Sequence, residues 1–173
     1  LERIPLASLT AEIPFASGPR LATAIPWGDV STAFLSTDIP NIEVYTVLPE
    51  KQVRQMRFLN HIRFALGWRP VQNRLKRWVD KHVEGPDEEE RCMDNSELYG
   101  DATESGARRV AMAMQTPNGY SLTHDAAISA VGRLLAETVP AGAQTPSMAF
   151  GDSFVLGLRG VRCSQPAAAP LQE

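Results

Sequence analysis

The stretch WGDVSTAFLSTDIPNIEVY, residues 27 to 45, concentrates side chains that could bind a polar ligand. Gly28 supplies a turn and Asp29 is a good N-cap with Thr32 three positions on, which predicts a short helix over DVSTAFLST. Unpaired backbone N–H groups at a helix start carry partial positive charge, and they bind carboxylate or phosphate when no side chain satisfies them. Asp29 and Thr32, with the neighbouring Trp27, are candidate substrate-binding residues. Capping alone also explains Asp29 and Thr32, and a core or interface position is the alternative for Trp27.

A second stretch, TPNGYSLT at 116–123, places a turn directly before another predicted helix. Tyr120 could serve there as a pocket wall or proton donor, and Thr123 as a hydroxyl at the same helix end. A turn with Thr123 as the helix cap is the structural alternative. The helix is expected to run for about fifteen residues and to end at Pro140. Its expected inward side consists of Ala127, Ile128, Val131, Leu134 and Leu135.

Motifs of the common enzyme classes are absent from the sequence. It has no GxSxG, P-loop, GxGxxG or Ser-His-Asp pattern, so no catalytic residue is assigned. The three histidines lack HxH or HExxH spacing and Cys92 and Cys163 form no CxxC pair, so no metal site is expected and reduced thiols are favoured over a disulfide. The net charge of -3 gives no nucleic-acid footprint. Without a signal peptide or an apolar run of about 18 residues, a cytoplasmic location is expected.

Helices and strands interleave without a regular βαβ rhythm. This order predicts an α+β fold, with a mixed, mostly antiparallel sheet and helices on one face. Two strands, 96–104 and 107–116, are expected to form a hairpin. One domain is expected over residues 1–163, followed by a disordered tail over 164–173. The other expected elements are strands at 20–26, 41–48 and 154–158 and helices at 49–67 and 70–82.

Charge is segregated along the chain. Residues 51–82 hold nine basic side chains and one acidic one, whereas residues 84–104 hold nine acidic side chains and one basic one. One explanation is a solvated helical face that packs near an acidic loop. The alternative is a basic amphipathic helix pair, interleaved with aromatic residues, that lies peripherally on an anionic membrane surface or on an acidic acyl carrier protein.

Five motifs occur in an order that resembles a known family: IPWGDVSTAF…STDIPNIEVY, GPDEEER, LYGDA, TPNGYSLT and TPSMAFG. From about Ile13 to Gly160 the chain is similar to the C-terminal part of the saccharopine dehydrogenase-like oxidoreductases, including trans-acting enoyl reductase-like members. The resemblance implies a two-domain enzyme, in which an N-terminal Rossmann domain binds NAD(P) and the later part forms the substrate and dimerisation domain. It also implies that the segments around Trp27, Asp29, Thr32 and Tyr120 line the substrate pocket.

The resemblance sets further expectations for this chain. No strand–GxGxxG–helix unit precedes Leu21, so the chain is expected to be the C-terminal portion of a longer reductase. Alone it is expected to bind no NAD(P), and its expected partners are the missing Rossmann domain and a second copy of itself. Where this chain has Asp38 the family commonly has Gly, which predicts a positive φ with slight strain. Where this chain has His124 the family usually has a small residue.

Two other functions are compatible with the same residues. The first is a non-catalytic module that serves only dimerisation or contact with a membrane surface or acyl carrier. The second is a carboxylate-ligand binder that uses the helix end at Asp29.

Overall fold

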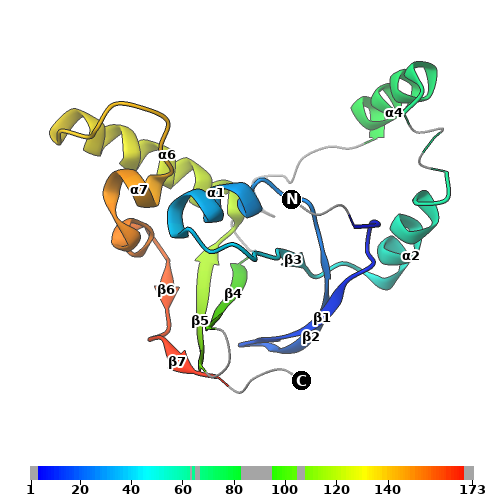
Figure 1. The fold of residues 1–173 in the computed structure, drawn as a ribbon. Helices are drawn as coiled ribbons and strands as arrows, with labels where there is room; N and C mark the ends of the chain where they lie inside the picture. The colour runs from blue at the N-terminus through cyan, green and yellow to red at the C-terminus, as the bar shows by residue number, and fades with distance from the viewer. Residues whose placement is uncertain (1–3, 63, 65–66, 83–94, 105–107, 170–173) are drawn as a thin grey trace. The chain divides into compact units, whose positions relative to one another are not determined.

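The computed structural model describes residues 4–62, 64, 67–82, 95–104 and 108–169. The chain has an α+β fold with antiparallel strand pairs and separate helices, as its sequence predicts (Figure 1). It divides into two compact units, and the single domain expected over residues 1–163 stays a prediction. The first unit holds Leu1–Ile13, Arg20–Phe34 and Ile39–Pro86, and the second holds Pro14–Pro19, Leu35–Asp38 and Asp87–Glu173.

The first sheet has three strands in the order β1-β2-β3. β1 (Thr10–Phe15) is followed by β2 (Gly18–Ala24), which confirms the strand expected at 20–26. β3 consists only of Tyr45–Thr46 and pairs antiparallel with the end of β2. The strand expected over 41–48 is therefore much shorter than its alternating pattern predicts.

The buried side chains of the first unit gather at the end of β2. Ala22 and Thr23 are almost fully buried, and Ile25 follows them. The backbone N–H of Ala24 donates to the carbonyl of Leu9 (3.0 Å), and the Thr23 hydroxyl donates to the same oxygen (3.2 Å). These bonds satisfy polar groups that would otherwise be costly to bury.

Two helices of the first unit begin where the sequence predicts. α2 (Glu50–Leu59) follows Pro49 directly, because proline needs no N–H partner at a helix start. It ends at Leu59, well before the expected end at residue 67. α4 (Arg69–His82) closely matches the helix expected at 70–82. The acidic stretch 84–94 lies outside the described residues.

Side chains at the end of α2 bond to the backbone of the N-terminal segment. Asn60 accepts from Leu6 N and donates to Leu6 O, both at 2.9 Å, and Arg57 Nε donates to the carbonyl of Ala7 at 3.0 Å. Ala7 is almost completely buried. The half-buried apolar residues of α2 are Val53, Met56 and Leu59.

The second unit is built on the predicted hairpin. β4 (Asn95–Glu104) and β5 (Arg108–Pro117) pair antiparallel over their full lengths, and the connecting residues 105–107 lie outside the described ranges. Arg109 of β5 is only 7% exposed. Its guanidinium is paired with the carboxylate of Asp101, at 2.7 Å from Nε. A charge buried to this extent needs such a partner.

Two short strands extend this sheet. β6 (Arg162–Cys163) and β7 (Ala167–Ala168) each pair antiparallel with β5. The backbone N–H of Ala169 also donates to the carbonyl of Arg109 (3.0 Å). Residues 164–173 were expected to form a disordered tail. Within them, Ala167 and Ala168 form β7 and pair with β5.

The helices of the second unit differ from their predictions in two ways. α6 (Gly119–Ala136) begins earlier than expected, because its N-cap is Asn118, whose side chain accepts from Tyr120 N (2.9 Å). α7 (Pro146–Phe150) is followed by a 3-10 helix, η1 (Asp152–Gly157), so the strand expected over 154–158 is wrong. The ring of Phe154 packs on that of Phe150 at a centroid distance of 5.0 Å, across the break that Gly151, with a φ of 86°, makes between α7 and η1.

Asp38 has the positive φ that the family likeness predicts. It follows the last residue of α1 (Asp29–Thr37) and has a φ of 57°. Helices often end with a residue in this left-handed conformation, where glycine has no Cβ penalty.

Asp38→Gly is therefore expected to raise the free energy of unfolding by about 0.5–1 kcal/mol. Urea unfolding of the two proteins measures this difference. Asp38→Ala is the matched control, because it keeps the Cβ and should give no gain. Equal stability of the glycine variant and the wild type would contradict the assigned strain.

Candidate functional site

Three candidate substrate-binding residues lie at the start of α1. Gly28, not Asp29, is in the N-cap position, because its carbonyl accepts the helical bond from Thr32 N (3.1 Å). Asp29 is the first residue of α1, where its negative charge favours the helix dipole. The Thr32 hydroxyl donates to the carbonyls of Gly28 (3.4 Å) and Asp29 (3.3 Å) instead of capping the helix. Trp27, Asp29 and Thr32 are all exposed, and they occupy one helix end without forming a closed pocket.

The other two candidates lie in the first turn of α6. Tyr120 is exposed, and the Thr123 hydroxyl donates to the carbonyl of Gly119 (2.7 Å). Thr123 therefore bonds within its own helix, and the expectation that it caps α6 is wrong. Asn118 satisfies one N–H of this helix end. The structure thus brings Trp27, Asp29 and Thr32 together in the first unit, and Tyr120 and Thr123 together in the second.

The side of α6 that was predicted to be buried is exposed, which is the largest difference between the sequence prediction and the structure. The residues expected to face inward are exposed, with Val131 at 57% and Leu135 at 86%. Their helical spacing places them on one side of α6 together with Tyr120. We call this surface the α6 apolar face, and it consists of Tyr120, Ala127, Ile128, Val131, Leu134 and Leu135.

Arg133 explains why α6 turns its apolar face outward. The Arg133 guanidinium lies over the ring of Phe150, with Cζ 5.1 Å from the ring centroid, and Nη1 donates to the Phe150 carbonyl (3.3 Å). Two further bonds of 2.9 and 3.0 Å join Arg133 to Glu137. These contacts, which no pattern of apolar residues predicts, direct the Arg133 side of the helix toward α7.

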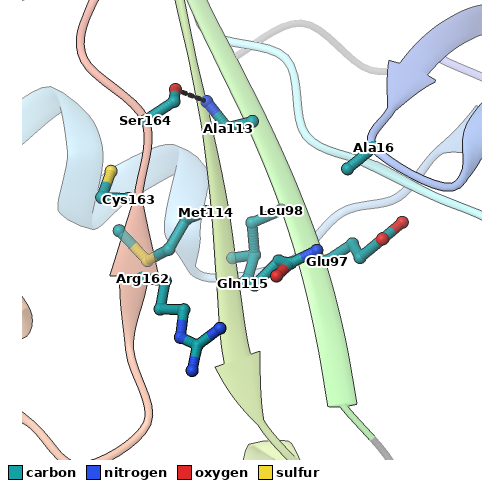
Figure 2. A pocket seen from close by; sticks show the side chains of 9 residues that line it. All are labelled: Ala16, Glu97, Leu98, Ala113, Met114, Gln115, Arg162, Cys163 and Ser164. Carbon is teal, nitrogen blue, oxygen red and sulfur yellow. Dashed lines mark hydrogen bonds between the residues drawn. The ribbon is translucent and has the colours of Figure 1, made fainter.

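A hollow of about 250 Å³ opens on the second sheet (Figure 2). Cross-strand pairing aligns Leu98, Met114 and Cys163, and likewise Glu97, Gln115 and Arg162. Because directly paired residues share a face, these are one mainly apolar and one polar row on opposite faces of the sheet. The sequence does not predict this hollow, because it depends on the pairing of β6 with β5, two strands that are far apart in the sequence.

The polar groups around this hollow are already engaged in part. The Glu97 carboxylate accepts from the Ser17 hydroxyl (2.6 Å), and the Ser164 hydroxyl accepts from Ala113 N (2.9 Å), as Figure 2 shows for the latter. Cys163 is a free, half-buried thiol. The volume lies below the roughly 300–1,000 Å³ of most ligand pockets. The hollow alone therefore does not define a substrate site.

A larger and more open hollow, of about 900 Å³, lies along the outer side of α2. Its lining includes two cations, Lys51 and Arg54, beside the exposed ring of Phe58. A surface of this composition suits an anionic partner with an apolar part.

Among the residues that the structure describes, Tyr45 is the one with a strongly shifted pKa. Partial burial, followed by the hydrogen bond that its hydroxyl donates to Glu43 (2.5 Å) and by the negative charge of Glu43, raises the pKa of Tyr45 from 10.0 to about 12. A phenol with this pKa stays protonated at neutral pH, where its hydroxyl donates to the Glu43 carboxylate. Its bond to Glu43 positions the ring at the end of the first sheet, which is a structural role.

The raised pKa of Tyr45 predicts a loss of stability in alkali. Between pH 10 and about 12 the unfolded chain releases the phenol proton whereas the folded chain retains it, so the free energy of unfolding falls as the pH rises. Urea unfolding over this range measures the effect. Tyr45→Phe should remove this part of the pH dependence, and Glu43→Gln should reduce it. Parallel pH profiles for the wild type and Tyr45→Phe would contradict the prediction.

Neither a metal cluster nor a membrane span is found in the part of the chain that the structure describes. Within those ranges no three His, Cys, Asp or Glu side chains are grouped to hold a metal ion. The helices there are too short or too polar to cross a bilayer. Comparison with protein-family models, curated proteins and solved structures finds no match to this chain. The likeness to the saccharopine dehydrogenase-like family thus depends on the five sequence motifs.

Proposed function

We propose that this chain is the substrate-binding and dimerisation part of an NAD(P)H-dependent oxidoreductase of the saccharopine dehydrogenase-like type. The observation that carries the proposal is the α6 apolar face, which consists of apolar side chains and Tyr120 and yet is exposed in the chain. Exposed apolar patches of this kind mark protein contacts. A chain with such a face functions together with another protein surface.

The α6 apolar face is the surface that we assign to dimerisation. Its six residues are uncharged, and helical spacing also places the exposed His124 on this side, between Tyr120 and Ile128. A two-fold contact of this type needs a self-complementary patch, which a single helix with an apolar side supplies. The ordered motifs, and the positive φ at Asp38, support the family assignment.

In this proposal the chemistry requires the Rossmann domain of the longer protein. The nicotinamide on that domain delivers hydride to the substrate. This chain contributes substrate contacts at two helix ends, one with Trp27, Asp29 and Thr32 in the first unit and one with Tyr120 and Thr123 in the second. The protein acts in the cytoplasm.

Fluorescence titration with NADPH and NADH tests whether cofactor binding requires the Rossmann domain. The 173-residue chain is expected to give no saturable binding, whereas the same chain joined to its Rossmann domain should bind one nicotinamide per subunit. Addition of carbonyl or enoyl substrates should then oxidise the bound cofactor. Tight binding by the chain alone, or none by the longer protein, would contradict the proposal.

A further inference from the structure

The apolar side chains of α4 are largely exposed to solvent. All of its residues except Val71 are exposed, including Trp78 at 56%. The indole of Trp78 stacks on the ring of His82, at 5.0 Å between centroids and 15° between planes. Helical spacing puts four apolar residues on one side, which we call the α4 apolar face: Val71, Leu75, Trp78 and Val79.

The rest of α4 is strongly basic. Five cations and one acid, Asp80, lie within its fourteen residues. By helical geometry Arg74 and Lys81 border the α4 apolar face beside Trp78, whereas the other cations lie farther round the helix. The five cations are Arg69, Arg74, Lys76, Arg77 and Lys81.

This combination selects one kind of partner. An acidic protein would satisfy the cations, but it gives no reason for exposing Trp78 and Leu75 on the same helix. A lipid interface accepts both, because indole rings favour the headgroup level and the long stems of Arg and Lys let their charges reach lipid phosphates and carboxylates. We infer that α4 binds the surface of an anionic bilayer, with the α4 apolar face at the headgroup–acyl boundary and its cations among the headgroups. This inference is independent of the proposed reductase function.

Co-sedimentation of the 173-residue chain with vesicles tests the inference. Binding is expected to phosphatidylcholine vesicles that contain phosphatidylserine, to be much weaker with phosphatidylcholine alone, and to decrease in high salt. Arg74→Gln with Lys81→Gln should lower the partition coefficient roughly 30-fold, at about 1 kcal/mol for each charge. The matched control is Arg108→Gln with Arg159→Gln, which removes two exposed charges elsewhere and should bind like the wild type.

Tryptophan fluorescence shows whether the α4 apolar face itself enters the interface. Trp27→Phe with Trp68→Phe leaves Trp78 as the only one of the three tryptophans. Its emission should shift to the blue on phosphatidylserine vesicles, and Trp78→Ser in the wild-type background should weaken sedimentation. The inference is overturned by equal binding to neutral vesicles, by an equal loss in the control pair, by an unshifted Trp78 emission, or by α4-dependent binding to an acidic carrier protein without binding to vesicles.

Discussion

Val131→Asp is expected to convert the proposed dimer into monomers without unfolding the chain. Val131 lies in the middle of the α6 apolar face and is 57% exposed in the single chain, so a charge there should change the free energy of unfolding of a monomer by no more than about 0.5 kcal/mol. In a dimer the same charge would be buried without a partner. We expect the dissociation constant to rise by about 30- to 1,000-fold, which corresponds to 2–4 kcal/mol. Sedimentation velocity over a concentration series measures it.

Ala136→Asp is the matched control for this substitution. Ala136 is also exposed on α6, but helical geometry places it about 140° round the helix from Val131, away from the α6 apolar face. The control should keep the dissociation constant of the wild type. If the wild type is monomeric at high concentration, or if Val131→Asp dimerises as the wild type does, the assignment of this face to dimerisation is wrong.

Asp101→Leu is expected to lower the free energy of unfolding by about 2–3 kcal/mol. It leaves the guanidinium of Arg109, which is only 7% exposed, without its carboxylate partner near the start of β5. The effect should be smaller than for a fully buried pair, because the Asp101 side chain is 30% exposed. Urea unfolding followed by circular dichroism measures the loss.

The double variant Asp101→Leu with Arg109→Met separates this cause from general damage to the strands. Replacing both charges by apolar side chains removes the desolvated cation, so most of the lost stability should return. A double variant that is as unstable as Asp101→Leu would show that the ion pair is not the reason. Either result is independent of the oligomeric state if the measurement is repeated in the Val131→Asp background.

The features that the sequence predicts correctly have local causes. The hairpin follows from the strand patterns of the two segments that pair as β4 and β5, and the start of α2 follows from Pro49. The helix at α4 follows from its period, whereas the positive φ at Asp38 was expected from the glycine that is common in the resembled family. In each of these the deciding residues lie within a few positions of the feature.

The features that the sequence misses depend on contacts between distant residues. The direction of α6 is set by Arg133 on Phe150, and η1 is accompanied by the packing of Phe154 on Phe150. The hollow at Cys163 needs β6 beside β5. For the candidate site, the sequence located both helix starts but not the capping residues, because Gly28 and Asn118 cap where Asp29 and Thr123 were expected.

Reading the coding sequence that precedes Leu1 tests the central claim most directly. The proposed function predicts an in-frame segment of roughly 150 or more residues that carries a strand, a glycine-rich turn and a helix typical of dinucleotide binding. A start codon directly before Leu1, in a gene without such a segment, would contradict the claim that this chain is the substrate and dimerisation part of a longer reductase.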